Sequence, residues 1–255
     1  DLLNATFSPH RKPDTLPRNT ADSRNEFTRV PMMRLSRLNR RHFLELGAAS
    51  GLTLVGAGLV IGSPANAQAP KTDNIPMADL MAANALEDVW QGSKDAPVTM
   101  IEYASMTCSH CAHFHEATYP TLKSKYIDAG KVRFAIREFP FDPLATAAFM
   151  LARCSGDKRD ALVDLLFAQQ KNWAFSNQPL QGLKNLTKQA GMADTAFDTC
   201  LKDQKLYENV NAVRDRGGKQ FGVDSTPTFF INGKRVSGAI SADELDKHLE
   251  PLLKS

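Results

Sequence analysis

The sequence lacks an excess of charge of one sign in most of its length. Its formal net charge is +3, but residues 1–67 hold nine of the 31 Lys and Arg residues and only five of the 28 Asp and Glu residues. Residues 68–255 are therefore close to neutral. Because a nucleic-acid-binding domain needs a basic surface in its folded part, we expect no nucleic-acid partner.

Long apolar stretches are also scarce. One extends from Leu46 to Ile61, and it is short and rich in glycine for a membrane span. We find no second stretch, internal repeat or low-complexity tract, so we expect no integral membrane domain. Hydrophobic residues make up 42% and charged residues 23% of the sequence, as in soluble globular proteins. A chain of 255 residues can form one domain with an insertion, or two small domains.

The N-terminal part of the sequence has the features of an export signal. We expect residues 1–31, which are polar and rich in Arg and Pro, to be a disordered or non-native leader. Residues 32–67 combine a basic segment, the apolar stretch and a small-residue site at which we expect cleavage after Ala67. Residues 40–44, Arg-Arg-His-Phe-Leu, resemble the twin-arginine signal, although Glu45 stands where that signal often has Lys. An ordinary secretory signal is the alternative, and either signal would place the remaining chain outside the cytoplasm.

The remaining chain contains strand-like and helix-like patterns in a recognisable order. A β-rich segment, a helical segment and a second β-rich segment follow one another within about forty residues, which is typical of a parallel βαβ unit. A long helical region and a hairpin come next, and Ser241 and Glu244 form a capping box for a last helix. The expected elements are a short helix at 77–86, strands at 88–91, 98–103 and 131–139, a helix at 109–127 that can kink at Pro120, helices between 143 and 221, strands at 228–231 and 234–237, and a helix at 241–253.

Two cysteines lie where the expected strand 98–103 is followed by a helix. The motif is Cys108-Ser109-His110-Cys111. A helix N-terminus presents free N–H groups and a partial positive charge, and both stabilise a thiolate. Cys108 is therefore the expected nucleophile, and Cys111 can resolve a mixed disulfide. His110 can add positive charge or a hydrogen bond near the Cys108 sulfur.

Two further positions bear on the same chemistry. Glu102, six residues before Cys108, can accept a proton from Cys111 if it lies beneath the pair. Pro227 follows Thr226 just before the strand 228–231. A cis bond at this proline would bring the Thr226 backbone against the cysteines, where an extended peptide can pair with it.

These motifs together resemble the DsbA-like branch of the thioredoxin superfamily. The resemblance rests on Glu-x5-Cys-Ser-His-Cys followed, after a helical region, by Thr-Pro-Thr-Phe-Phe-Ile-Asn-Gly, and it covers residues 88–254. It implies an α/β thioredoxin fold, with residues 88–142 and 222–255 forming the thioredoxin domain, 143–221 an inserted helical domain and 68–87 a linker with a short helix. Ser109 stands where well-known members have Pro, and Ser225 where many relatives have Gly.

The resemblance also implies an activity and partners. It assigns the redox pair to Cys108 and Cys111, the cis-proline to Pro227 and the buried acid to Glu102. It implies a monomeric periplasmic enzyme that needs no cofactor and donates a disulfide to reduced secreted proteins. It further implies reoxidation by a quinone-linked membrane partner of the DsbB type.

Other functions are compatible with parts of the pattern. A disulfide isomerase or reductase would use the same chemistry, but the isomerases of this family have a separate dimerisation domain, for which residues 68–87 are too few. A non-enzymatic exported chaperone would use the cysteines only as a structural disulfide. A metal site would need His113 and His115 beside the two cysteines, but His113 would point away from the helical face that Cys111 and His115 share. We therefore expect no metal.

The other two cysteines lie in the helical region. An oxidising compartment favours pairing of Cys154 with Cys200, which leaves the active-site pair intact. Two buried free thiols are the alternative. The larger aromatic residues are expected in the core or at a domain interface, namely Trp90, Phe167, Trp173 and Phe175.

Overall fold

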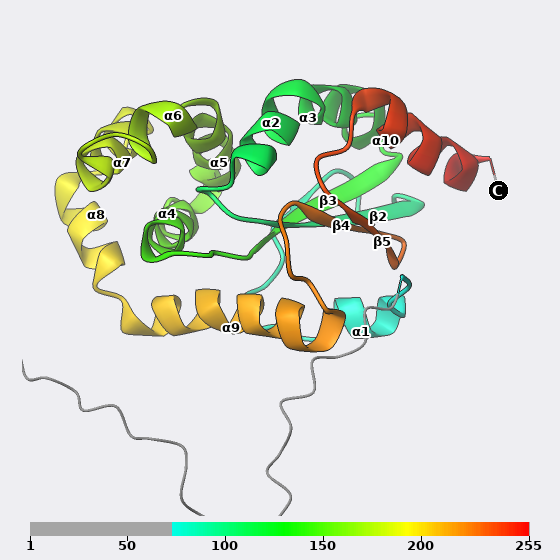
Figure 1. Cartoon of the computed structure of the whole chain (residues 1–255), viewed down its shortest axis with the longest axis horizontal. Coiled ribbons are helices and arrows are strands. Elements are labelled where there is room, and N and C mark those ends of the chain that lie inside the picture. The colour runs from blue at the N-terminus through cyan, green and yellow to red at the C-terminus, as the bar shows by residue number, and fades with distance from the viewer. Residues whose placement is uncertain (1–72, 255) are drawn as a thin grey trace, which may run out of the picture. The chain divides into compact units, whose positions relative to one another are not determined.

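A five-stranded mixed sheet lies at the centre of residues 73–254, the part of the chain that this computed structural model describes (Figure 1). The leader and the export signal that we expect from the sequence lie outside the described residues. The strand order is β1-β3-β2-β4-β5, with β2 and β3 parallel and the other neighbours antiparallel. The strands are β1 (Trp90–Gln91), β2 (Val98–Ala104), β3 (Val132–Glu138), β4 (Thr228–Ile231) and β5 (Lys234–Ser237).

Helices cover both faces of the sheet. One face packs against α2 (Ser109–Ala117), α3 (Tyr119–Thr121), the π-helix Leu122–Ile127, α10 (Ala242–Leu249) and the 3₁₀ turn Glu250–Leu253 (Figure 1). The other packs against α1 (Met77–Met81) and α9 (Gln204–Phe221). Because β2 is covered on both faces, all seven of its residues are buried. This explains its nearly continuous apolar sequence, in which Glu102 is an exception.

The chain leaves the sheet after β3 and returns to it at β4. The segment between them contains α4 (Pro143–Cys154), the 3₁₀ turn Gly156–Lys158, α5 (Arg159–Ala168), α6 (Gln170–Trp173), α7 (Pro179–Gln189), α8 (Asp194–Leu201) and α9. Helices α4 to α8 lie to one side of the sheet (Figure 1). A mixed sheet interrupted by a helical segment is the thioredoxin-like architecture that the sequence predicts.

The expected helix 109–127 is broken into three pieces. It is interrupted at Thr118, whose hydroxyl donates a hydrogen bond to the Ile240 carbonyl at 2.7 Å. Pro120 follows two residues later and has no N–H to donate to the preceding turn. The chain continues as a π-helix from Leu122. The helix expected at 77–86 is also shorter than predicted, because α1 ends at Met81.

The C-terminal elements agree closely with the sequence-based expectations. Strands β4 and β5 have the predicted bounds. Their turn contains Asn232 and Gly233, with φ of 46° and 91°, which a two-residue hairpin of this kind requires. Ser241 and Glu244 form the full reciprocal capping box of α10. The expectation for Phe175 was wrong, since this residue is 61% exposed.

A buried ion pair joins β3 to the segment that precedes the sheet. The Arg137 guanidinium donates to both carboxylate oxygens of Asp88, at 2.8 and 2.7 Å. It also donates to the Tyr103 hydroxyl at 3.1 Å and to the Leu80 carbonyl at 2.7 Å. Four acceptors therefore satisfy a side chain that is only 1% exposed, as a buried charge requires.

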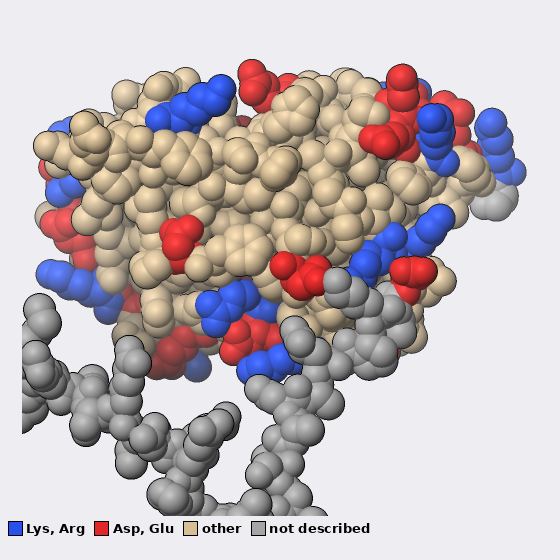
Figure 2. All heavy atoms as spheres, viewed as in Figure 1, with Lys and Arg blue, Asp and Glu red and all other residues tan. Residues whose placement is uncertain are grey.

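The surface in view carries charges of both signs. Figure 2 shows Lys and Arg interspersed with Asp and Glu, mostly toward the edge of that face, with uncharged residues over its middle. Among residues 73–254, no helix is both long and apolar enough to cross a bilayer.

Candidate active site

The Cys108–Cys111 motif lies at the junction of β2 and α2. Cys108 is the N-cap residue of α2, with extended backbone angles, and Cys111 lies in the first turn of the helix. The first N–H groups of a helix have no partner within it and carry the positive end of its dipole. The structure therefore places the Cys108 sulfur next to groups that stabilise a negative charge.

The two cysteines are free thiols in different environments. Cys108 is partly exposed and Cys111 is fully buried. A hydrogen bond from the Cys111 thiol lowers the pKa of Cys108 to about 5, with smaller contributions from Thr226 and from the backbone N–H groups of Cys111 and His110. Burial raises the pKa of Cys111 well above its usual value, and its hydrogen bond to Cys108 and the Glu102 charge raise it further. At neutral pH, the accessible sulfur is thus a thiolate and the buried one a thiol.

The loop before β4 approaches Cys108 from a distant part of the sequence. The Cys108 sulfur lies 3.2 Å from the carbonyl oxygen of Thr226, and the Thr226–Pro227 peptide bond is cis. Thr226 is buried. The structure therefore brings Thr226 and Pro227 to the redox pair.

Glu102 is fully buried on β2, where its charge acts on Cys111. One of its oxygens, Oε2, lies 2.9 Å from Nε2 of His115, which is on α2 one turn beyond Cys111. Its other oxygen has no hydrogen-bond partner in the described part of the chain. Sequence reasoning placed His115 near the site but missed its pairing with Glu102. The available signal was the four-residue spacing that puts His115 on the helical face of Cys111.

His110 lies at an exposed position of the motif, unlike the two cysteines. Its side chain is exposed, and it is the backbone N–H of His110 that lowers the pKa of Cys108. A role for its imidazole therefore stays a prediction.

Gln170 links the helical insertion to the active-site loop. From α6, its amide nitrogen donates to the carbonyl of Met106 at 2.9 Å and to the carbonyl of Cys108 at 3.0 Å. The side chain is buried, so these bonds satisfy groups that water does not reach. Sequence reasoning missed this residue, and no local motif marks it.

The other side of the loop is attached to the start of α4. The Thr107 hydroxyl donates to the Asp142 carboxylate at 2.5 Å, and the same carboxylate accepts from the N–H of Ala145 as the N-cap of α4. The segment before Cys108 is therefore held by side chains from both α4 and α6.

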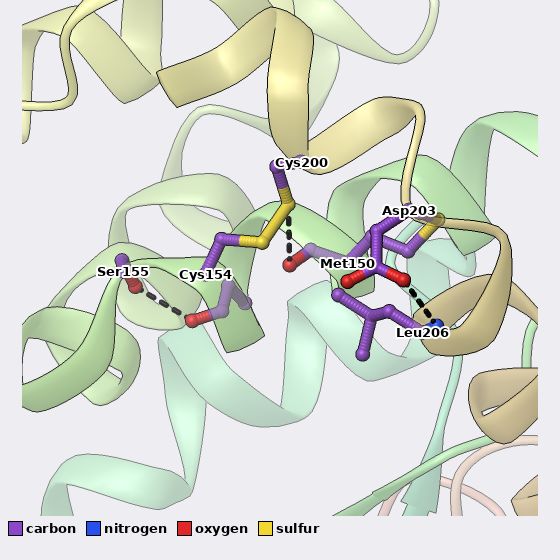
Figure 3. Close-up of a disulfide and its surroundings, with 7 residues drawn as sticks. Met150, Cys154, Ser155, Cys200, Asp203 and Leu206 are labelled. Carbon is purple, nitrogen blue, oxygen red and sulfur yellow. Dashed lines mark hydrogen bonds between the residues drawn. A yellow bond between two sulfur atoms is a disulfide. The ribbon is translucent and has the colours of Figure 1, made fainter.

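A disulfide joins Cys154 and Cys200 within the helical insertion (Figure 3). It connects the end of α4 to α8, across 46 residues of sequence. The Cys200 sulfur lies 3.2 Å from the Met150 carbonyl oxygen. Since both cysteines belong to the insertion, this bond does not involve the redox pair.

Within residues 73–254, no group of three or more His, Cys, Asp and Glu side chains is arranged to hold a metal ion. His113 is exposed, whereas His115 is buried against Glu102.

The chain is similar to several proteins whose names refer to disulfide chemistry. A "Putative protein-disulfide oxidoreductase" of Rickettsia bellii is 34% identical over 169 residues, which cover 64% of this chain and 65% of that protein. A "Probable disulfide bond formation protein D" of Bacillus cereus is 27% identical over 172 residues, covering 64% and 77% of the two chains. This chain spans 60 to 65% of the length of the Rickettsia relatives that it matches.

A solved structure and a family model are also similar to this chain. The crystal structure of alpha-DsbA1 of Wolbachia pipientis matches with a TM-score of 0.63 and 27% identity, covering 69% of this chain and 98% of that one. The model of a thioredoxin family, described as "Thioredoxin", matches residues 84–251. This range includes both halves of the sheet, the Cys108–Cys111 motif and Pro227. The chain therefore belongs to the thioredoxin family.

Proposed function

We propose that this protein is an exported thiol–disulfide oxidoreductase that donates a disulfide to reduced secreted proteins. One observation supports this function above the others: an accessible Cys108 with a pKa of about 5 lies one helical turn from a buried Cys111 whose pKa is raised. Stabilising the reduced thiolate makes the disulfide easier to reduce, so such a pair gives its disulfide away. The names of the relatives agree with this chemistry.

The reaction proceeds through a mixed disulfide. A substrate thiolate attacks the Cys108 sulfur of the Cys108–Cys111 disulfide, and Cys111 leaves as a thiolate and takes up a proton. A second substrate thiolate then attacks the substrate sulfur and displaces Cys108 as a stabilised thiolate. The substrate loses two electrons and gains a disulfide, while the protein gains two electrons and becomes the dithiol.

The surrounding residues have distinct roles in these steps. Glu102 exchanges the proton of Cys111, because it is the acid whose charge acts on that buried thiol. The Thr226 carbonyl contacts the Cys108 sulfur, and the backbone beside Pro227 would pair with an extended substrate. The backbone N–H of His110 lowers the pKa of Cys108. Its exposed imidazole can contact the incoming substrate.

We further propose a location and partners. The twin-arginine-like segment supports export to the periplasm, where the protein would act as a monomer. A membrane quinone reductase of the DsbB type would then reoxidise it. N-terminal sequencing of the exported protein tests cleavage of the signal: a mature end at Gln68 supports it, and a mature end that retains Arg40 and Arg41 contradicts it.

The activity is tested by three assays on the same preparation. The reduction potential of the Cys108–Cys111 pair is measured against glutathione, and oxidation of a dithiol peptide and reduction of insulin are followed separately. An oxidase has a potential well above that of thioredoxin, which is about −270 mV, and oxidises the peptide faster than it reduces insulin. A potential near that of thioredoxin indicates a reductase, and inactivity in all the assays indicates a structural disulfide.

A further inference from the structure

The Glu102–His115 pair is more deeply buried than an ordinary ion pair. The side chains of His115 and Glu102 are 2% and 0% exposed, and the atoms that join them are 2.9 Å apart. Each side chain also keeps one buried atom with no hydrogen-bond partner among residues 73–254, Oε1 of Glu102 and Nδ1 of His115. Two polar side chains excluded from water usually satisfy all their atoms, so this arrangement needs an explanation beyond stability.

The position of the pair suggests that explanation. His115 follows Cys111 by one helical turn, and Glu102 lies on β2 where its charge acts on Cys111. Cys111 must lose a proton each time it attacks the Cys108 sulfur, and it must gain one each time a substrate thiolate displaces it from the Cys108–Cys111 disulfide. Because Cys111 is fully buried, that proton must pass to a group inside the protein, and Glu102 and His115 are the acid–base groups adjacent to it.

The environment of His115 restricts how it can share that proton. Its ring stacks on Phe167 of α5, with centroids 4.2 Å apart, and also packs against Tyr119 of α3 at 4.9 Å. The Tyr119 hydroxyl donates to Gln91 at 2.5 Å. Asp164 of α5 is a further titratable group that interacts with His115, and burial raises the pKa of its carboxyl. Among the described residues, Glu102 alone is hydrogen-bonded to the imidazole.

We propose that His115 is a positioning residue that holds Glu102 as a carboxylate–imidazole pair and allows it to accept and return the proton of Cys111. This inference rests on the proposed function. In the closing step, the Cys111 thiol transfers its proton to the pair, and the Cys111 thiolate attacks the Cys108 sulfur of a mixed disulfide. A Cys108–Cys111 disulfide forms, and the partner sulfur leaves as a thiolate with the electron pair of the broken S–S bond. When the protein donates its disulfide, Cys111 leaves and the pair returns the proton.

The closing step is measured by reacting the reduced full chain with oxidised glutathione. Acid quenching followed by mass spectrometry gives the amount of mixed disulfide at each time. This species forms when Cys108 attacks glutathione disulfide, and it disappears when Cys111 attacks the Cys108 sulfur. We expect His115→Gln to slow the disappearance by at least about tenfold, because a positioned acid–base group contributes about 10²-fold or more. The pH dependence of this step should change, while the formation step stays within about twofold of the wild type. His113→Gln, on the exposed side of the same helix, is the matched control and should change neither step.

A double variant tests whether His115 acts through Glu102. In the Glu102→Gln background, adding His115→Gln should slow the closing step no further. Closing within twofold of wild type in His115→Gln, or full additivity with Glu102→Gln, would overturn the inference while leaving the proposed function intact. Failure of the wild-type protein to form any mixed disulfide would overturn both.

A measurement on the wild type covers the case in which His115→Gln does not fold. Nitrogen-15 NMR distinguishes the protonated ring nitrogen of His115 in the reduced protein. The inference requires a proton on Nε2, because an ionised Glu102 can only accept a hydrogen bond. An imidazole protonated only on Nδ1 would overturn it.

Discussion

The low pKa of Cys108 predicts how the stability of the reduced protein changes with pH. In the folded protein this pKa is about 5, whereas a cysteine in an unfolded chain has a pKa of about 8.5. Between these values the unfolded state binds one more proton, so the free energy of unfolding rises with pH. This contribution is fully present above the unfolded pKa and is lost as the pH falls through 5. The oxidised protein has no Cys108 thiol and should lack it.

The size of the effect follows from the same shift. A pKa difference of one between the folded and unfolded states is equivalent to about 1.4 kcal/mol, so the full pKa difference of Cys108 would change the free energy of unfolding by about 5 kcal/mol. Because Cys108 is partly exposed, solvent screening reduces this, and we expect about 2 to 3 kcal/mol between pH 5 and 8. The predicted rise in the free energy of unfolding ends near pH 8, because the raised pKa of Cys111 makes this free energy fall as the pH increases further. Its contribution diminishes as the pH rises through the unfolded value.

Urea unfolding of the reduced and oxidised forms measures this difference. The experiment uses a Cys154→Ala/Cys200→Ala background, so that only one redox pair remains, with a phosphine reductant that acts across the pH range. The free energy of unfolding of the reduced form, minus that of the oxidised form, should increase from pH 5 to pH 8. The Cys108→Ser variant cannot form the redox disulfide, so it replaces the reduced form as the control: its free energy of unfolding, minus that of the oxidised parent, should lack the increase. A flat difference, or the same increase in Cys108→Ser, would refute the link between the Cys108 thiolate and stability.

Three further predictions concern contacts away from the sulfurs. Gln170→Leu removes the donor that bonds the Met106 carbonyl and one of two donors of the Cys108 carbonyl, which also accepts from the Ala112 N–H, and should cost about 1–3 kcal/mol in urea unfolding; an unchanged midpoint would contradict it. Replacing Cys154 and Cys200 with Ala should destabilise the protein by up to about 4 kcal/mol, from the entropy of the loop that they close, without changing the Cys108–Cys111 potential; a shift in that potential would show coupling between the pairs. Arg137→Met leaves the Asp88 carboxylate unpaired and should cost about 3–5 kcal/mol by thermal or urea unfolding, and a loss below 1 kcal/mol would contradict the importance of this ion pair.

Local signals in the sequence were sufficient for much of the fold. The bounds of β4 and β5 could be predicted because an apolar run, an Asn-Gly turn and a second short run are adjacent in the chain. The capping box at Ser241 is a pattern of four residues and was equally visible. The break at Thr118 was not, because its hydroxyl bonds to Ile240, 122 residues away.

The site was predictable to a similar extent. The junction that holds Cys108 and Cys111 is local, and the expected pairing of Cys154 with Cys200 needed the assignment of that pair, the even count of four cysteines and an oxidising compartment. The partners of these residues come from other elements: His115 bonds to Glu102 across the strand–helix junction, and Gln170 reaches Cys108 over 62 residues. No sequence pattern specifies such contacts, since they depend on how the insertion packs against the sheet.

The two hydrogen bonds of Gln170 limit how far this fold can be simplified. A minimal protein that joined β3 directly to α9 would keep every strand and both redox cysteines. It would nevertheless remove the Gln170 donor from the Met106 carbonyl and from the Cys108 carbonyl, which would keep only its bond from the Ala112 N–H among the described residues. The helical segment therefore helps to hold the loop that carries Cys108. Replacing it with the corresponding helical segment of a relative would require a side-chain amide at the position of Gln170.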